Sequence, residues 1–123
     1  MGRLWKALLY SLAGLRDAWR HPAPRLELFA IVVAIPLALA LPITATDRVI
    51  LVASVVAIFV VELLNTSIES AIDRIGAERH ELSRVAKDVG SAAVLVTTLM
   101  AAAIWIALAG PSLVALWRSL SVR

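Results

Sequence analysis

The sequence predicts an all-α membrane protein, in which an amphipathic surface helix precedes three transmembrane helices within a single domain of residues 1–123. Composition and three long apolar stretches carry this prediction. Of the 123 residues, 61% are hydrophobic and 17% are charged, whereas soluble domains average about 45–50% apolar and about 25% charged residues. With a mean hydropathy of +0.89, too few charges remain to cover a soluble surface.

Residues 3–20 are expected to form the amphipathic helix. Basic and polar side chains occupy one side, while the other side carries Leu4, Trp5, Leu8, Leu9, Leu12, Leu15 and Trp19. A helix of this kind lies in the membrane interface rather than crossing it, although an ordinary helix packed on protein has the same pattern. Pro22 and Pro24 are expected to end it, because proline does not continue a helix interior.

The first span is expected at residues 28–43, where only Pro36 and Pro42 interrupt a run without charges. Pro36 is expected to kink this helix. The second helix is expected at residues 49–75, with Thr46 or Asp47 as its N-cap. Its first half is continuously apolar, and its second half becomes a polar extension above the membrane.

The third helix is expected at residues 84–109 with Ser83 as its N-cap. Its apolar span begins at Ala92, and the small residues from Gly90 to Ala93 permit another helix to approach closely. Gly110 and Pro111 then break the helix, which leaves residues 110–123 as a short tail in which Trp117 is expected to anchor at the interface.

The distribution of lysine and arginine predicts the orientation in the membrane. Nine of the twelve basic residues lie in the N-terminal segment and the second connection, namely Arg3, Lys6, Arg16, Arg20, Arg25, Arg74, Arg79, Arg84 and Lys87. The first connection and the tail carry only Arg48, Arg118 and Arg123. Basic residues accumulate on the cytoplasmic side, so the N-terminus is expected in the cytoplasm and the C-terminus on the opposite side of the inner membrane.

Four polar residues leave the second apolar run at spacings of three, four and four: Glu62, Asn65, Glu69 and Asp73. On a helix these spacings place all four on one face, here called the carboxylate stripe. A carboxylate within a span is costly and is by default a functional-site hypothesis. On the next helix Arg84, Lys87, Asp88 and Ser91 share a face by the same spacing and are expected to oppose the stripe.

These residue types suit phosphoryl transfer. A deep carboxylate such as Glu62 accepts a proton from a hydroxyl, Glu69 nearer the water holds Mg²⁺, and Lys87 offsets charge on the transferred group. Two alternatives stay open: polar contacts between helices with a solvated outer face, and ion or proton conduction. No Walker-type phosphate loop occurs, the absence of cysteine excludes thiolate chemistry, and His80 is expected at the surface or as a cap rather than on zinc.

The longest motifs are specific to one family. Residues 61–69 (VELLNTSIE), 73–76 (DRIG), 80–83 (HELS) and 86–94 (AKDVGSAAV) strongly resemble the prokaryotic diacylglycerol kinase family, which also includes undecaprenol kinases. Tyr10-Ser11, Gly14 to Arg16 and Ala18-Trp19 match its N-terminal surface helix. The resemblance covers nearly the whole chain. It implies a homotrimeric bundle with active sites shared between protomers.

The resemblance also implies roles for individual residues. Glu62 matches the general base, Asn65 a residue that positions base and substrate, and Lys87 the lysine that stabilises the phosphate. Glu69 matches a metal ligand for Mg²⁺. The expected ATP-binding residues are Arg3, Tyr10, Ser11, Asp73, Lys87 and Asp88, and the residues expected near the lipid are Glu27 and Ser91.

One departure concerns the metal. The family has a glutamate between the surface helix and the first span, whereas this chain has a shorter segment, His21 to Arg25, that lacks it. Asp17 or Glu27 is a candidate replacement, and a raised Mg²⁺ requirement is expected. The implied function is transfer of the γ-phosphate of ATP to diacylglycerol, giving phosphatidic acid. The alternatives are an undecaprenol kinase and a non-catalytic membrane interaction protein or conduit.

Overall fold

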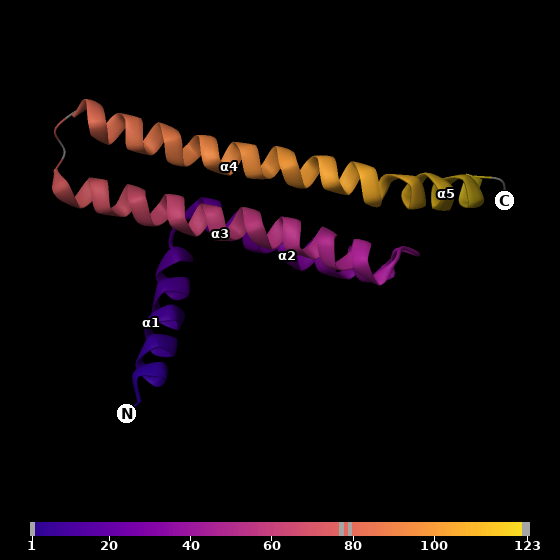
Figure 1. The fold of residues 1–123 in the computed structure, drawn as a ribbon, viewed down its shortest axis with the longest axis horizontal. Coiled ribbons are helices and arrows are strands. Elements are labelled where there is room, and N and C mark those ends of the chain that lie inside the picture. Colours follow the sequence, from indigo (N-terminus) through magenta and orange to yellow (C-terminus); the bar gives the residue numbers. More distant parts are fainter. Residues whose placement is uncertain (1, 77, 79, 122–123) are drawn as a thin grey trace.

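The computed structural model describes residues 2–76, 78 and 80–121, and within them five helices follow one another (Figure 1). They are α1 (Arg3–Ala18), α2 (Pro22–Ala40), α3 (Ala45–Ile75), α4 (Glu81–Leu108) and α5 (Gly110–Ser121). Helices α2, α3 and α4 are each long and apolar enough to cross a membrane. The prediction of an all-α protein with three candidate spans is therefore confirmed.

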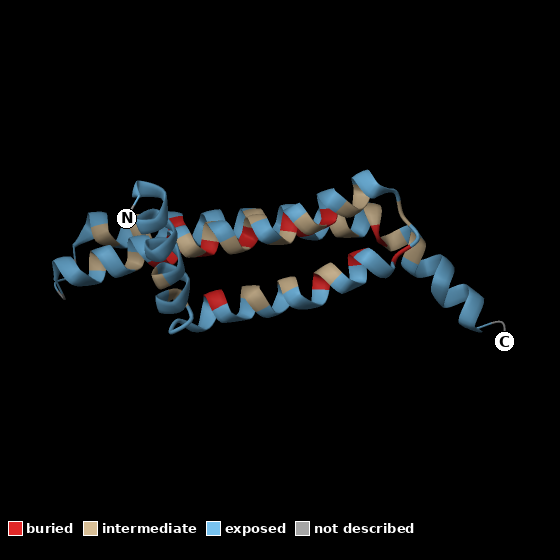
Figure 2. Ribbon diagram, turned by 90° about the horizontal axis from the view of Figure 1, so that it is seen from below, coloured by how far each residue is buried: buried red, intermediate tan, exposed pale blue. Residues whose placement is uncertain are grey.

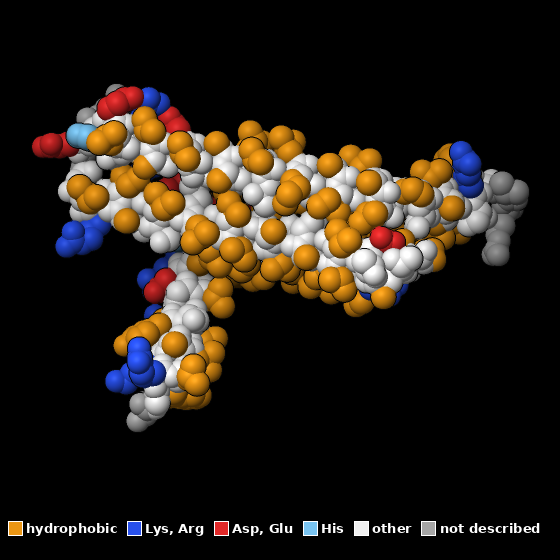
Figure 3. All heavy atoms as spheres, in the orientation of Figure 1, with side chains coloured by type: hydrophobic (Ala, Val, Ile, Leu, Met, Phe, Trp, Pro, Cys, Tyr) orange, Lys and Arg blue, Asp and Glu red, His pale blue; other side chains and the backbone are white. Residues whose placement is uncertain are grey.

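The three long helices form an elongated bundle in which α3 packs against both α2 and α4. Helix α1 projects steeply from the bundle at the start of α2, and α3 and α4 extend beyond this point, whereas α5 continues from α4 at the opposite end (Figure 1). Hydrophobic side chains cover the middle of the bundle, while charged side chains gather at its ends and on α1 (Figure 3). Arg79 and Arg123, which were counted for the orientation, lie outside the described residues.

The prolines after α1 have a different role from the one expected. Helix α1 ends at Ala18, but α2 already begins at Pro22, so Pro22 and Pro24 form its first turn. Proline is tolerated there because the first N–H groups of a helix have no intrahelical partner. Farther along, α2 continues through Pro36 to Ala40.

The N-cap of α3 is Thr44, so the expectation of Thr46 or Asp47 was wrong. The Thr44 hydroxyl accepts a hydrogen bond from the Asp47 N–H at 3.1 Å and donates one to the Asp47 carboxylate at 2.7 Å. A cap must precede the first turn and accept from its free N–H groups. Because the helix begins at Ala45, Thr46 and Asp47 already lie inside that turn.

The N-cap of α4 is His80 rather than Ser83. The His80 Nδ1 accepts a hydrogen bond from the Leu82 N–H at 3.2 Å, which confirms the expected capping role of His80. The helix begins at Glu81, two residues before Ser83, because the histidine side chain satisfies an N–H that otherwise lacks a partner.

A compact cluster closes the end of the bundle farthest from α1. Its buried members are Ala38, Leu41, Leu51 and Ala109, from all three spans. Beside it the Arg48 guanidinium donates to the backbone carbonyls of Ala38 at 2.9 Å and Leu41 at 3.1 Å. Ala38 lies in the last turn of α2, where no intrahelical N–H remains to bond its carbonyl, and Leu41 is the C-cap, whose carbonyl also accepts the Ile43 N–H at 2.9 Å.

The tail is helical. Helix α4 ends at Leu108 and α5 begins at Gly110 without a connecting loop. Figure 2 shows α5 at an angle to α4 and projecting beyond the bundle, with its residues exposed. Pro111 lies at the start of α5, where proline is compatible with a helix although it ends the preceding one.

Candidate functional site

The carboxylate stripe runs from a buried to an open environment along α3. Glu62 and Asn65 are only 5% and 7% exposed, Glu69 is half-buried and Asp73 is exposed. Because the burial decreases toward Ile75, water reaches the outer carboxylates more readily than Glu62. The stripe therefore offers one secluded acid–base group and one more hydrated ligand position two turns away.

Hydrogen bonds within α3 orient the inner part of the stripe. The Asn65 amide Nδ2 donates to Glu69 Oε1 at 3.1 Å, and the Thr66 hydroxyl donates to Glu62 Oε1 at 3.4 Å. Thr66 is buried and four residues from Glu62, a spacing at which helical side chains meet. Sequence reasoning missed Thr66, although a hydroxyl one turn after a buried acid was the available signal.

Asn65 also defines the closest approach of α4 to α3. An added Cβ at the buried Gly90 would overlap Asn65 Oδ1 and would lie 3.3 Å from Asn65 Cγ. Asn65 Oδ1 is itself buried without a hydrogen-bond partner in the described structure. Of the four small residues expected to admit another helix, Gly90 is the buried one, while Ser91, Ala92 and Ala93 are exposed.

An ion pair joins the outer part of the stripe to α4. Lys87 Nζ lies 2.5 Å from Asp73 Oδ1, and both side chains are partly exposed to solvent. Asp88 does not face the stripe, because its carboxylate pairs with Arg84, which also pairs with Glu81. A hollow of about 230 Å³ adjoins the ion pair and is lined by Ile72, Asp73, Gly76, Glu78, His80, Ser83, Arg84 and Lys87.

A larger cavity of about 520 Å³ lies between α1 and α3, on the side of α3 that carries Thr66. Small residues of α1 leave room for this cavity. Its lining residues are Ser11, Gly14, Leu15, Asp17, Ala18, His21, Leu63, Thr66, Ser67 and Ser70. Thr66, which lines this cavity, also donates its hydroxyl to Glu62, so one residue separates Glu62 from the cavity.

The other residues predicted for the site have fewer contacts with the carboxylate stripe. Glu27 on α2 is half-buried and close enough to Glu62 for their like charges to interact. Ser91 is exposed on α4, and Arg3 and Tyr10 are exposed on α1. Of the nucleotide residues expected on α1, the structure brings Ser11 to the cavity beside Thr66.

The Glu69 carboxylate is a suitable ligand for a magnesium ion that binds together with the phosphates of a substrate. In the described residues no group of three His, Cys, Asp or Glu side chains is arranged to hold a metal alone. Mg²⁺, however, is usually bound by one or two carboxylates together with substrate phosphates and waters. Glu69, half-buried beside Asn65, supplies such a carboxylate. Asp17 is instead paired with Arg16 at 3.5 Å and Arg20 at 3.7 Å.

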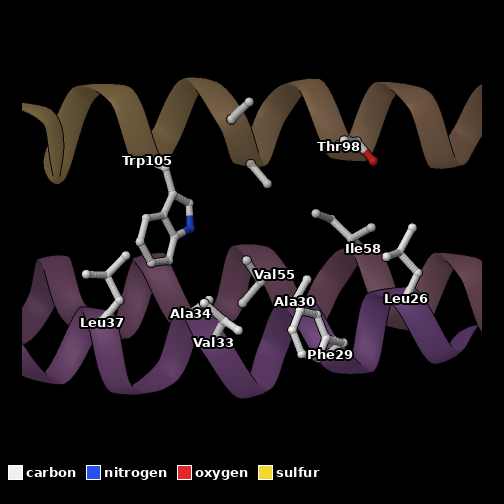
Figure 4. A pocket seen from close by; sticks show the side chains of 12 residues that line it. Leu26, Phe29, Ala30, Val33, Ala34, Leu37, Val55, Ile58, Thr98 and Trp105 are labelled. Carbon is white, nitrogen blue, oxygen red and sulfur yellow. The ribbon is translucent and has the colours of Figure 1, made fainter.

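An apolar groove of about 470 Å³ opens between α2, α3 and α4 in the middle of the bundle. Figure 4 shows Leu26, Phe29 and Val33 along α2, with Trp105 projecting from α4 toward them. One end of the groove, at Leu26, adjoins Glu27. Trp105 therefore packs inside the groove rather than at an outer interface.

Fold and site together define a polytopic membrane protein with acid–base and phosphate-compatible side chains at one end of its bundle. Residues 9–109 match the family described as Prokaryotic diacylglycerol kinase. The chain is 47% identical over 104 residues to the diacylglycerol kinase of Escherichia coli (strain K12), covering 84% of this chain and 85% of that relative.

Two further relatives, also named diacylglycerol kinase, agree. The protein of Haemophilus influenzae is 41% identical over 97 residues, covering 78% of this chain and 82% of that relative. The protein of Pseudomonas aeruginosa is 40% identical over 104 residues, covering 84% and 85%. This chain belongs to the prokaryotic diacylglycerol kinase family.

Proposed function

We propose that this chain is a diacylglycerol kinase that transfers the γ-phosphate of ATP to the lipid hydroxyl, giving phosphatidic acid and ADP. The observation that carries the proposal is the position of Glu62. It is buried at the end of the stripe and accepts a hydrogen bond from Thr66, a residue that lines the cavity between α1 and α3. Lys87 lies on the facing helix α4, where it pairs with Asp73 at the exposed end of the stripe.

In this mechanism Glu62 accepts the proton of the lipid hydroxyl. The hydroxyl oxygen then forms a bond to the γ-phosphorus, and the bond from that phosphorus to the oxygen it shares with the β-phosphate breaks. The protein forms no covalent bond in this reaction. Catalysis comes from positioning the reactants in line and from stabilising charge on the transferred group.

The nucleotide is assigned to the outer part of the stripe. Lys87 would stabilise phosphate charge, with Asp73 holding its ammonium group at 2.5 Å. The hollow beside this pair is also lined by Arg84, and a guanidinium group favours phosphate. Asp88 would act through Arg84, while Arg3, Tyr10 and Ser11 would reach the nucleotide from α1.

Asn65 and Glu69 connect the two halves of the site. Asn65 donates to Glu69 and lies one turn from Glu62, so it would position both carboxylates. Mg²⁺ held by Glu69 would neutralise charge on the phosphates when bound. Because the family's second acidic ligand is absent and Asp17 is engaged by two arginines, half-maximal activity is expected at a higher Mg²⁺ concentration than in a relative with that glutamate. A Mg²⁺ titration of both enzymes at fixed ATP tests this, and equal midpoints would contradict it.

The lipid is assigned to the membrane side of Glu62. The apolar groove that begins at Leu26 offers a path for an acyl chain, and Glu27 and Ser91 would lie near the lipid entry. The same chemistry serves undecaprenol, since both lipids present a hydroxyl, and apolar contacts distinguish such substrates only weakly. The proposal further includes a homotrimer with shared sites in the inner membrane, with α1 and the connection between α3 and α4 in the cytoplasm.

A direct assay tests the function. Purified protein receives ATP, Mg²⁺ and either diacylglycerol or undecaprenol, and phosphate transfer to each lipid is measured with Glu62→Gln as the control variant. We expect transfer to diacylglycerol that the Glu62→Gln variant lacks. Faster phosphate transfer to undecaprenol than to diacylglycerol would identify undecaprenol as the substrate instead. No transfer to either lipid at any Mg²⁺ concentration would favour the non-catalytic alternative. Undiminished transfer by Glu62→Gln would instead exclude Glu62 as the general base.

A further inference from the structure

Helix α5 lies beyond the region that defines the family. The family match ends at residue 109, and α5 occupies Gly110–Ser121. None of its residues is buried in the structure. The packing of the three spans therefore does not explain why this segment is helical, and its apolar residues have no partner within the described protomer core.

The sequence of α5 is strongly amphipathic. Leu113, Leu116, Trp117 and Leu120 follow the spacing i, i+3, i+4, i+7 and so share one face. These four side chains are 40%, 51%, 69% and 65% exposed. Arg118 and Ala115 lie on the opposite face, and Ser119 flanks the apolar one. Helix α5 contains no acidic residue.

The position of α5 in the chain indicates that it lies at the boundary between membrane and water. Ala109, the residue before α5, is part of the cluster that closes the outer end of the spans, so α5 begins where the chain leaves the membrane. A helix of 12 residues is about 18 Å long, which is too short to cross a hydrocarbon layer of about 30 Å. Four large apolar side chains on one face are equally unsuited to bulk water.

We propose that α5 is a membrane-surface helix that docks its apolar face on the headgroup region of the leaflet into which α4 emerges. This leaflet is opposite the one that α1 would contact. Trp117 would lie at headgroup depth, where tryptophan is enriched. The long side chain of Arg118, which starts from the water-facing side of α5, would reach the phosphates of anionic phospholipids. The joint at Gly110 and Pro111 allows α5 to turn onto the surface, because Pro111 lacks the N–H that would continue α4. Space around Gly110 is open as well.

Because the chain has no cysteine, single labels test this proposal in the full-length protein. Leu116→Cys, Leu120→Cys and Ala115→Cys are each labelled with a nitroxide and reconstituted into vesicles of phosphatidylcholine alone or mixed with phosphatidylglycerol. Accessibility to oxygen, which partitions into lipid, is compared with accessibility to a water-soluble nickel chelate. Kinase activity reports whether each labelled protein is folded.

We expect the oxygen-to-nickel accessibility ratio to be severalfold higher for Leu116→Cys and Leu120→Cys than for Ala115→Cys. Phosphatidylglycerol should increase this difference, and an added Arg118→Gln change should remove the increase. Equal nickel accessibility at all three positions would overturn the proposal in favour of a free helix in water. Shielding from both reagents with spin–spin broadening would overturn it in favour of contact between copies of the chain.

Discussion

The two ends of the three-span bundle solve the same problem of polar groups near lipid in opposite ways. The end of the bundle farthest from α1 is called the outer end here, and the end that carries the carboxylate stripe is called the inner end. At the outer end, the Arg48 guanidinium donates hydrogen bonds to carbonyls at the end of α2, beside a tight apolar cluster. At the inner end, α3 carries buried Glu62 and Asn65 into the contact with α4, and Asn65 Oδ1 has no partner in the described structure. At the outer end the carbonyls at the end of α2 are bonded, although Trp105 Nε1 beside the cluster is buried without a partner among the described residues. At the inner end the atom without a partner, Asn65 Oδ1, belongs to the proposed active site.

This difference separates stability from function. Buried polar atoms without partners are costly, and such sites persist where a ligand or reaction uses them. Substitutions at the inner end should therefore change turnover more than stability, and those at the outer end should do the opposite. Four predictions test this division, beginning with the largest effect.

The largest effect is expected for Glu62→Gln. The amide keeps the size of the side chain but does not accept a proton, so turnover should fall by about 10²–10⁴-fold, the usual contribution of a general base. The unfolding midpoint should be unchanged or slightly higher, because a buried carboxylate is replaced by a neutral group. Initial rates and a denaturation curve on the same preparation measure both. A large loss of stability would place Glu62 among the structural residues.

Gly90→Ala should be the next largest. A methyl group at this position overlaps Asn65 Oδ1, so α4 must move away from α3 or the Asn65 amide must rotate away from Glu69. Overpacking of this kind costs about 1–3 kcal/mol, and turnover should fall by roughly tenfold or more, as expected for a small misplacement of reacting groups.

Gly110→Ala is the matched control, since an added Cβ there meets nothing within 4 Å. It should leave turnover unchanged. The double variant Gly90→Ala with Asn65→Ala tests whether the change at Gly90 affects turnover through Asn65. If Gly90 acts through Asn65, the second change adds little to the loss of turnover, whereas fully additive losses would contradict this path.

Arg48→Met tests the outer end. It removes both hydrogen bonds from Arg48 to the end of α2 and leaves the Ala38 carbonyl without a donor, whereas the Leu41 carbonyl keeps the Ile43 N–H at 2.9 Å. The free energy of unfolding should fall by about 1–3 kcal/mol. Turnover per folded molecule should not change. Unfolding in mixed detergent measures the loss, and Arg48→Lys should lose less because it keeps one donor. Reduced turnover at unchanged stability would break the division between the two ends.

Thr66→Val should give the smallest effect. Valine keeps the shape of threonine but removes the hydroxyl that bonds Glu62 at 3.4 Å. Because this contact is long, we expect a several-fold decrease in kcat, with little change in the KM for ATP, which is assigned to the outer part of the stripe. Thr66→Ser retains the donor and should recover most of the activity. An equal loss in both variants would indicate that packing, rather than the hydroxyl, matters.

Much of the architecture follows from local patterns. The length of the apolar runs predicts three spans, and the helical spacing of Glu62, Asn65, Glu69 and Asp73 predicts a polar stripe. Caps were less well predicted. Thr46 or Asp47 was predicted in place of Thr44, and Ser83 was predicted as the N-cap of α4 although a capping role was also expected for His80. Several residues near a helix start can accept a hydrogen bond, and only the backbone conformation decides among them.

The sequence by itself determined the helical class and the shared face of the carboxylates, since both depend on periodicity and hydrophobicity along one segment. Only the tertiary structure decided that Lys87 pairs with Asp73 while Asp88 pairs with Arg84. It alone placed Gly90 against Asn65 and linked Thr66 to both Glu62 and the cavity beneath α1. These contacts depend on the relative rotation and separation of neighbouring helices, which are set by the packing of whole side-chain surfaces rather than by any one segment.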